Sequence, residues 1–307
     1  MRRQVEVIGA AWGLGGADPG CEHAPSALAP LLREDLERRG VHALEGPMVS
    51  AAAGARAGER RRQALVGKLC GELASAVATS VRNGRLPCVL GGDHSCAGGT
   101  WSGVARALQG RLGLVWIDAH MDSHTRGTSH TGRLHGMPLA WLLGEDDDPR
   151  YGLTSGVIDP AHVCLVGVRS YEPEEAARLA RLGVRVIMME EAERRGLATV
   201  LDEALAIAGA GTEAFGLSID LDAVRPDQAP AVGTPVAGGL DARALARALE
   251  PLGARRGLAA VELVEYSPRR DSDGATARVA VALLRAALCG PGDDADVVAH
   301  PVERPQA

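Results

Sequence analysis

The sequence predicts an α/β protein, built as a three-layer α/β/α sandwich around a mainly parallel sheet. Short β-rich apolar runs alternate along the chain with longer segments that are rich in Ala, Leu and Arg and repeat with helical period. Several of these apolar runs are continuous and show no alternation with polar residues. Continuous apolar strands are typical of a parallel sheet that helices cover on both faces.

The expected elements follow one another in this alternation. A first strand at 4–10 precedes a helix from Ser26 to Arg39 and a longer helix near 58–82. Further strands are expected at 86–92, 112–118, 162–168, 184–189, 213–220 and 257–266. Further helices are expected near 98–109, 135–143, 174–182, 197–209, 241–253 and 275–288.

The length of 307 residues is compatible with one large α/β domain. No internal repeat or low-complexity linker marks a boundary inside the chain. We therefore expect a single domain over 1–290. The last segment, 291–307, is rich in Pro, Asp and Ala and is expected to be a loosely ordered tail.

Composition restricts the class of function. Apolar residues make up 46% of the chain and charged residues 23%, which is typical of a globular protein. The net charge is −6 and no dense block of Lys or Arg is present, which argues against a nucleic-acid partner. A small cationic substrate fits this charge better.

Cysteine usage and apolar runs predict a cytoplasmic protein that makes no use of a membrane. The six cysteines form no CxxC pair, which favours a reducing compartment over a disulfide framework. The apolar stretch at the start is too short for a signal peptide and is interpreted as a strand. No apolar run is expected to approach membrane-spanning length.

Chemistry is expected where strands end, because ligands of open parallel sheets bind beyond the carboxyl ends of the strands. The first such place is VLGGDHS, in which a Gly-Gly turn is followed by Asp93, His94 and Ser95. Taken alone this signal is weak, since a lone histidine is more often structural. The case for His94 as a functional residue depends on the other two places.

The second place is LGLVWIDAHMDSH, in which an apolar strand leads into Asp118, His120, Asp122 and His124. Their spacing of two predicts that an extended backbone directs all four to the same side. So many ionisable groups on one face would repel or desolvate one another, unless a cation lay among them. The alternative is a solvated polar loop that alternates by chance.

The third place, FGLSIDLD, again ends an apolar strand with two aspartates, Asp220 and Asp222. The full set has four aspartates and two histidines but no thiolate: His94, Asp118, His120, Asp122, Asp220 and Asp222. Oxygen and nitrogen ligands suit divalent ions such as manganese better than a structural zinc. Six protein ligands predict two bridged ions, and such a pair can generate a hydroxide nucleophile near neutral pH.

These motifs together resemble the ureohydrolases, and most closely their arginase branch. The resemblance extends from near residue 9 to near residue 288 and includes GADPGCEHAPSAL at 16–28. Its strongest segments are GGDHS (91–95), DAHMD (118–122), LHGMP (134–138), SIDLDAVRPDQAPAVGTPVAGGL (218–240) and VELVEYSP (261–268). It implies about eight mainly parallel strands, two Mn²⁺ ions per chain, and a homo-oligomer that is a trimer or hexamer.

The resemblance also implies roles for individual residues. By this resemblance, one manganese would be held by His94 and Asp122, the other by His120 and Asp222, and Asp118 and Asp220 would bridge them. A bridging hydroxide would attack the guanidinium carbon of the substrate. Asp122 would hold and then accept its proton, and His135 would carry a proton to the leaving amine.

Glu265 is expected to pair with the guanidinium group, whose planar fork suits a carboxylate, and Thr234 lies beside it. Judged on local sequence alone, His135 could equally cap the following helix, and Glu265 could form an ordinary ion pair. The tryptophans Trp101, Trp116 and Trp141 are interpreted as packing residues, because each stands in an apolar run.

The positions that would recognise the amino-acid end of the substrate are His124, Thr131 and Glu172. Thr131 and Glu172 keep the hydroxyl and carboxylate character of arginases, but His124 replaces an Asn and Ser170 replaces an acid. The role of His130 stays open. The predicted reaction is hydrolysis of L-arginine to L-ornithine and urea.

Three other functions stay open. The chain could be an agmatinase or another guanidino-acid hydrolase, such as a guanidinobutyrase, because the loop that reads the substrate is altered. A related deacetylase would use one zinc and fewer acidic ligands. A catalytically silent scaffold would usually have lost a metal ligand, and none of the six is missing.

Overall fold

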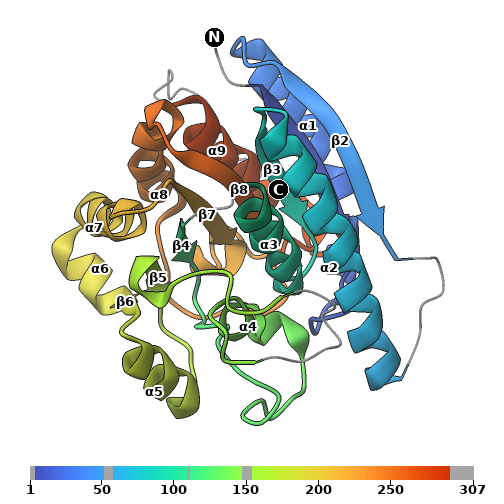
Figure 1. Cartoon of the computed structure of the whole chain (residues 1–307). Coiled ribbons are helices and arrows are strands. Elements are labelled where there is room, and N and C mark those ends of the chain that lie inside the picture. The colour runs from blue at the N-terminus through green and yellow to red at the C-terminus, as the bar shows by residue number, and fades with distance from the viewer. Residues whose placement is uncertain (1–3, 52–57, 109–110, 147–153, 291–307) are drawn as a thin grey trace, which may run out of the picture.

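A computed structural model describes residues 4–51, 58–108, 111–146 and 154–290 (Figure 1). Within these residues eight strands form one sheet, and every pairing in it is parallel. The strands lie in the order β2-β1-β3-β8-β7-β4-β5-β6. Their bounds are β1 Val5–Ala11, β2 Ala43–Ser50, β3 Leu86–Gly91, β4 Leu112–Ile117, β5 Val163–Val168, β6 Arg185–Met188, β7 Ala214–Asp220 and β8 Leu258–Val264.

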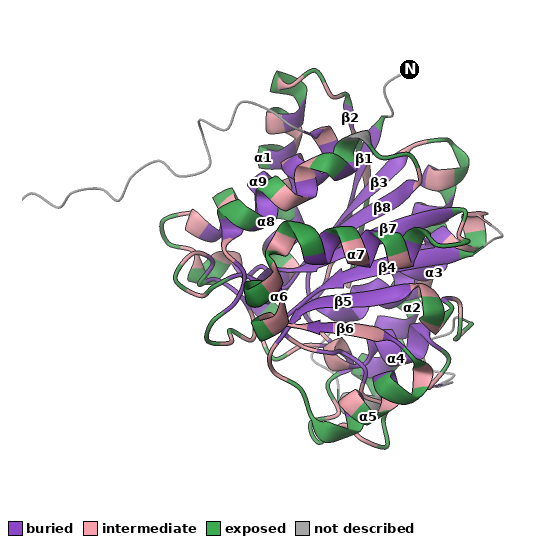
Figure 2. Ribbon diagram, turned by 90° about the vertical axis from the view of Figure 1, so that its left-hand side faces the viewer, coloured by how far each residue is buried: buried purple, intermediate pink, exposed green. Residues whose placement is uncertain are grey.

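Helices cover both faces of this sheet (Figures 1 and 2). One layer contains α1 Ala24–Arg38, α6 Met189–Arg195, α7 Leu197–Gly209, α8 Ala242–Leu249 and α9 Ala275–Cys289. The other layer contains α2 Glu59–Arg82, α3 Ala97–Leu108, α4 Pro138–Leu142 and α5 Pro173–Leu182. Each layer packs a separate hydrophobic cluster against its face of the sheet. The predicted three-layer α/β/α architecture is confirmed.

The central strands explain why the apolar runs are continuous. All residues of β3, β4, β5, β7 and β8 are buried, as the purple strands of Figure 2 show. Because both faces of these strands meet helices, neither face selects polar side chains. Because the strands β3, β8, β7 and β4 are adjacent and parallel, their carboxyl ends lie side by side.

Strand β2 and helix α6 were not predicted. Strand β2 lies at an edge of the sheet and contains Gly46 and Pro47, which weaken a strand signal but are tolerated where one side of the strand is unpaired. The strand expected at 184–189 ends at Met188, and α6 begins at the next residue. Of the helix expected at 135–143, only Pro138–Leu142 is α-helical, and His135 lies in a preceding 3₁₀ turn.

Helix α2 corrects the expectation about apolar length. Its segment Arg61–Arg82 is long and apolar enough, by length and composition, to cross a membrane. Half of the apolar window is buried in the protein, where residues such as Leu69 and Leu73 pack against the sheet layer. This burial explains the apolar composition without a membrane. The tail expected at 291–307 lies outside the described residues.

Candidate metal centre

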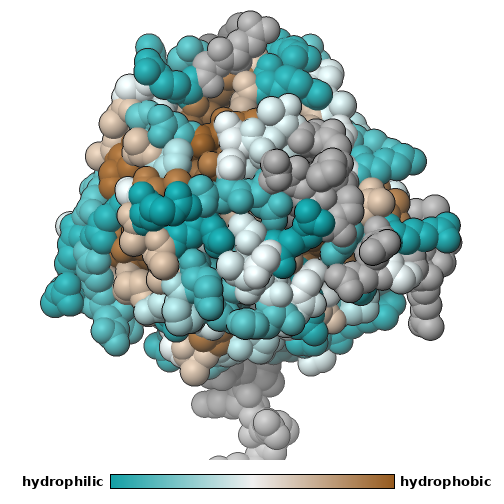
Figure 3. All heavy atoms as spheres, turned by 60° about the horizontal axis from the view of Figure 1, so that its bottom comes forward, coloured by the Kyte–Doolittle hydropathy of each residue, from teal (hydrophilic) through white to brown (hydrophobic). Residues whose placement is uncertain are grey.

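The predicted ligands meet at the carboxyl ends of three strands. His94 follows the turn after β3, Asp118 directly follows β4, and Asp220 is the last residue of β7. Glu265 directly follows β8, which lies between β3 and β7. Figure 3 shows that the face at this end of the molecule, the bottom of Figure 1, is mostly hydrophilic.

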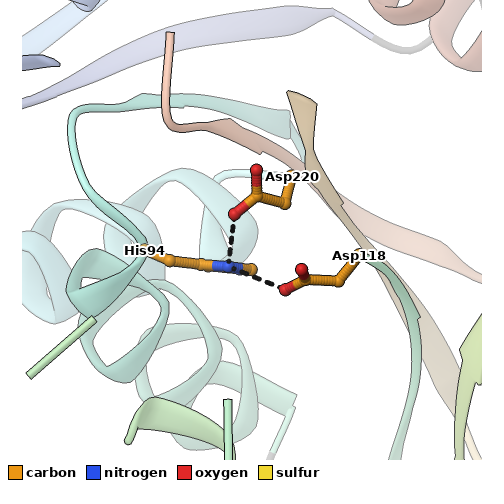
Figure 4. A group of neighbouring side chains, drawn as sticks. All are labelled: His94, Asp118 and Asp220. Carbon is orange, nitrogen blue, oxygen red and sulfur yellow. Dashed lines mark ion pairs between the residues drawn. The ribbon is translucent and has the colours of Figure 1, made fainter. Parts of the chain in front are cut away.

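The imidazole of His94 faces three carboxylates. Its Nδ1 lies 3.3 Å from Asp118 Oδ2, 3.0 Å from Asp122 Oδ2 and 3.2 Å from Asp220 Oδ2. Figure 4 shows two of these carboxylates, those of Asp118 and Asp220, directed at the ring. Nδ1 is buried, yet it makes no hydrogen bond of acceptable geometry. A buried nitrogen that faces only oxygen atoms is a natural ligand for a cation.

A second group forms around His120. Its Nδ1 lies 3.1 Å from Asp222 Oδ2 and 3.5 Å from Asp118 Oδ1. Asp118 therefore belongs to both groups, with one carboxylate oxygen directed at each histidine. A carboxylate in this arrangement can bridge two cations.

The electrostatics of the centre favour bound cations. Burial and the neighbouring charge of Asp118 raise the pKa of Asp122 to about 6. Burial, together with Asp222 and Asp118, also raises the pKa of Asp220 well above its ordinary value. These two shifts reflect the cost of burying carboxylates close to one another, a cost that bound cations would offset. The donor set contains imidazole nitrogens and carboxylate oxygens but no thiolate, and it fits a pair of hard or borderline divalent ions.

Backbone conformation at the site corrects the prediction of an extended segment. Strand β4 ends at Ile117, and Asp122 has a φ of 45°. Among the described residues, only Asp122 and Glu265, with a φ of 66°, have positive φ without being glycine. Such strain persists where surrounding contacts enforce it, and it is common at functional sites. The turn at Asp122 explains why its side chain reaches His94 while His124 does not join the ligands.

His135 and Glu265 form a hydrogen-bonded pair beside the centre. Nδ1 of His135 lies 3.0 Å from Glu265 Oε1, which also accepts a hydrogen bond from the backbone N–H of His94 at 2.9 Å. Burial alone would lower the pKa of His135, but the charge of Glu265 outweighs this effect and raises it to about 9. A protonated imidazole is therefore available at neutral pH.

Comparison with known proteins agrees with this geometry. The family model described as "Arginase family" matches residues 3–290. The chain belongs to the arginase family. It is 38% identical over 294 residues to an arginase of Bacillus caldovelox, covering 92% of this chain and 97% of that protein. It is 34% identical to an arginase of Bacillus subtilis, covering 94% of this chain and 98% of that protein.

Solved structures confirm the arginase fold. The native arginase of Bacillus caldovelox superposes with a TM-score of 0.86 at 36% identity, covering 94% of this chain and 99% of that one. An arginase of Entamoeba histolytica superposes with a TM-score of 0.85 at 25% identity, covering 94% and 99% of the two chains. The resemblance stated from the sequence motifs is thereby confirmed.

The remaining residues predicted from the arginase resemblance line one cavity of about 160 Å³. Its wall includes His120, Asp122, His124, Ser129, His130, Thr131, Arg133, His135, Gly136, Glu172, Glu175, Asp220 and Thr234. Thr234 Oγ1 donates to Asp222 Oδ2 at 3.0 Å, so it touches a ligand as well as the cavity. Glu265 lies behind His135, and Ser170 is not among the residues that line the described cavity.

His124 belongs to a separate group at the rim of the cavity. Its Nε2 lies 3.0 Å from Glu172 Oε2 and 3.4 Å from Glu175 Oε2, and its Nδ1 lies 3.1 Å from Thr128 Oγ1. Burial and the neighbouring Glu172 raise the pKa of the Glu175 carboxyl to about 8. His124 therefore organises two carboxylates at the rim.

Sequence reasoning missed several residues that support the ligands. Trp116, interpreted as a packing residue, stacks on the ring of His94 with centroids 4.2 Å apart and donates to Asp118 Oδ2 at 2.9 Å. Arg169 donates to the backbone oxygen of Asp222 at 2.7 Å. The only sequence signal for Trp116 was its position two residues before Asp118. Because residues i and i+2 of a strand share a face, that spacing could have indicated the contact.

Proposed function

We propose that this chain is a ureohydrolase that splits L-arginine into L-ornithine and urea at a pair of Mn²⁺ ions. The observation that carries the proposal is the position of Asp118, whose two oxygens face the His94 group and the His120 group. Two buried groups of His and Asp residues that share one carboxylate suit two ions better than one. The absence of thiolate from both groups favours manganese over zinc.

The proposed assignment of ligands follows the two groups. His94 and Asp122 would hold one ion, and His120 and Asp222 would hold the other. Asp118, which belongs to both groups, and Asp220, which belongs to the His94 group, would contact both ions. When bound, the ion pair would lower the pKa of a water molecule and supply a nucleophile near neutral pH.

The chain's own residues would move the protons. Asp122 lines the cavity and would accept a proton from the attacking water. His135 lines the same cavity and would donate a proton to the leaving amine. Glu265 holds His135 in place, and its carboxylate is proposed to balance the charge of the guanidinium group.

The rim suits the amino-acid end of arginine. Glu172, half exposed and hydrogen-bonded to His124, offers a carboxylate to an α-ammonium group. Thr131, which lines the same cavity, offers a hydroxyl to an α-carboxylate. The related Entamoeba histolytica arginase was solved in complex with L-ornithine, the amino-acid product of the proposed reaction. We further propose a single catalytic domain over 1–290, a cytoplasmic location and a trimeric or hexameric assembly.

The test is urea release by the purified chain after manganese loading, with metal content measured on the same sample. L-Arginine, agmatine and 4-guanidinobutyrate are compared as substrates. We expect about two Mn²⁺ per chain and the highest kcat/KM with L-arginine. Urea release from agmatine alone would contradict the arginase assignment, and a metal content near one zinc per chain would favour a deacetylase.

Loss of one ligand tests the centre itself. Asp122→Asn keeps the volume of the side chain, and Asn tolerates positive φ. Because the amide is neutral and no longer a base, we expect urea release to fall by at least about 10²-fold. Unchanged urea release in this variant would show that chemistry occurs elsewhere.

A further inference from the structure

A chain of buried hydrogen bonds runs from the metal centre into the core of the sheet. Nε2 of His94 lies 3.0 Å from Ser218 Oγ, and Ser218 Oγ donates to Glu262 Oε1 at 2.9 Å. Ser218 lies in β7 and Glu262 in β8, and the two are register partners in neighbouring strands. Both residues are fully buried, and His94 is 1% exposed.

Glu262 has no place in the proposed chemistry, yet the fold satisfies it completely. Its Oε1 also accepts from Trp101 Nε1 at 3.2 Å, and its Oε2 lies 3.5 Å from Cys96 Sγ. The indole ring fits against β7 because Gly216 has no Cβ, which would collide with it. No Lys or Arg contacts this carboxylate among the described residues. A buried carboxylate that is costly to maintain and contacts only neutral donors suggests a role through one of those donors.

The hydrogen-bond donors determine the direction of each bond between His94, Ser218 and Glu262. An indole N–H can only donate, so Glu262 Oε1 acts as an acceptor. Ser218 then donates its hydroxyl proton to that oxygen and can only accept from Nε2 of His94. With a cation bound among Asp118, Asp122 and Asp220, His94 would therefore carry its proton on Nε2 and present the lone pair of Nδ1 to that ion.

We propose that Ser218 and Glu262 are positioning residues that hold His94 in its metal-binding tautomer and thereby make the two ion positions unequal. This inference rests on the ion pair of the proposed function. The ring of His120 is 26% exposed, and its Nε2 has no hydrogen-bonded side chain among the described residues. A hydrogen-bonded acceptor behind a ligating histidine increases its basicity and fixes its orientation. The His94 position depends on this support, and the His120 position does not.

The experiment counts Mn²⁺ retained by the full chain during titration, using the electron paramagnetic resonance signal of free Mn²⁺. Ser218→Ala removes the link, and Ser102→Ala is the matched control, because Ser102 is a buried serine that bonds only to the backbone of its own helix. We expect Ser218→Ala to lower the affinity for one of the two Mn²⁺ ions by about 10- to 100-fold and to leave the affinity for the other unchanged. Ser102→Ala should bind both ions as the wild type does.

Three further variants separate positioning from general destabilisation. Ser218→Thr retains the hydroxyl and should recover most of the lost affinity. In a His94→Ala background, Ser218→Ala should cause no additional loss, because the residue acts through His94. Glu262→Gln offers a weaker acceptor of the same shape and serves as a second probe, with a loss of about threefold at the same ion. It also tests the link if Ser218→Ala fails to fold.

The melting temperature gives an independent readout. Manganese raises the melting temperature of a protein that binds it only when folded. We expect this increase to be smaller in Ser218→Ala than in Ser102→Ala, with similar metal-free values. The inference would be overturned if Ser218→Ala bound each of the two ions as tightly as the wild type does. It would also be overturned if Ser218→Ala and Ser102→Ala lost manganese affinity equally. A wild-type chain that binds two ions but releases no urea would contradict the proposed function alone.

Discussion

The carboxylate of Glu265 accepts a hydrogen bond from Nδ1 of His135 across 3.0 Å. The same oxygen accepts the backbone N–H of His94 at 2.9 Å. One buried oxygen therefore fixes the proposed proton donor relative to the turn that carries the candidate metal ligand His94. The positive φ of Glu265 places its side chain in this position directly after β8.

Glu265→Gln should impair catalysis more than metal binding. The amide removes the charge that keeps His135 protonated and weakens its hydrogen bond. A well-placed general acid contributes at least about 10²-fold to a rate, so kcat for urea release should fall by about that factor. Manganese content should stay at the wild-type value. Loss of metal without a specific loss of kcat would contradict the role given to this pair.

The pair also predicts how the stability of the metal-free protein depends on pH. The pKa of His135 rises from 6.5 to about 9 because the charge of Glu265 outweighs the effect of burial. A raised histidine pKa stabilises the folded state below about pH 6.5, and this contribution is lost as the pH rises through 9. The gap corresponds to about 3 kcal/mol.

Urea denaturation of metal-free wild type and His135→Gln at pH 6, 8 and 10 measures this contribution. The wild type should exceed the variant by most of that energy at pH 6 and by little at pH 10. The comparison between variant and wild type cancels the titration of those buried groups whose pKa does not depend on His135. A difference in unfolding free energy that is constant over this range would show that the pKa of His135 is not raised.

Sequence alone predicted the layers and brought out the candidate ligands, because both depend on local patterns. Continuous apolar runs identified the buried strands, and acids at the carboxyl ends of two of them, Asp118 directly after β4 and Asp220 as the last residue of β7, marked the candidate site. The edge strand β2 was not predicted, because Gly46 and Pro47 interrupt its run of β-forming residues and only one of its sides is paired. A strand whose register depends on a neighbour carries little signal of its own.

The contacts between distant segments could not be predicted. The alternation from Asp118 to His124 suggested one extended face, but the strain at Asp122 turns the chain, and His124 joins Glu172 instead. The link from His94 through Ser218 to Glu262 spans 168 residues of sequence and depends on the register of β7 against β8. Only the strand pairing brings these three side chains into contact.

Gly233 makes room for the Glu265 carboxylate. A Cβ at this position would lie 2.5 Å from Glu265 Oε2, a distance that forces one group to move. Because two hydrogen bonds hold that carboxylate, Gly233→Ala should displace it and lower kcat by about tenfold. Gly136→Ala is the control, since a Cβ there meets nothing within 4 Å although the residue lines the same cavity. Equal rates for both variants would show that the position of Glu265 does not matter for turnover.

The rim should discriminate substrates through the two charges of an amino acid. Glu172→Gln should raise KM about tenfold for L-arginine and agmatine, which carry an ammonium group, and should not affect 4-guanidinobutyrate. Thr131→Ala should instead raise KM for L-arginine and 4-guanidinobutyrate, which carry a carboxylate, and should not affect agmatine. Glu174→Gln is the control, because this exposed glutamate lies outside the cavity. Because each change removes a contact to one end of the substrate, a uniform rise in KM across all three compounds would indicate a distorted cavity and refute these assignments.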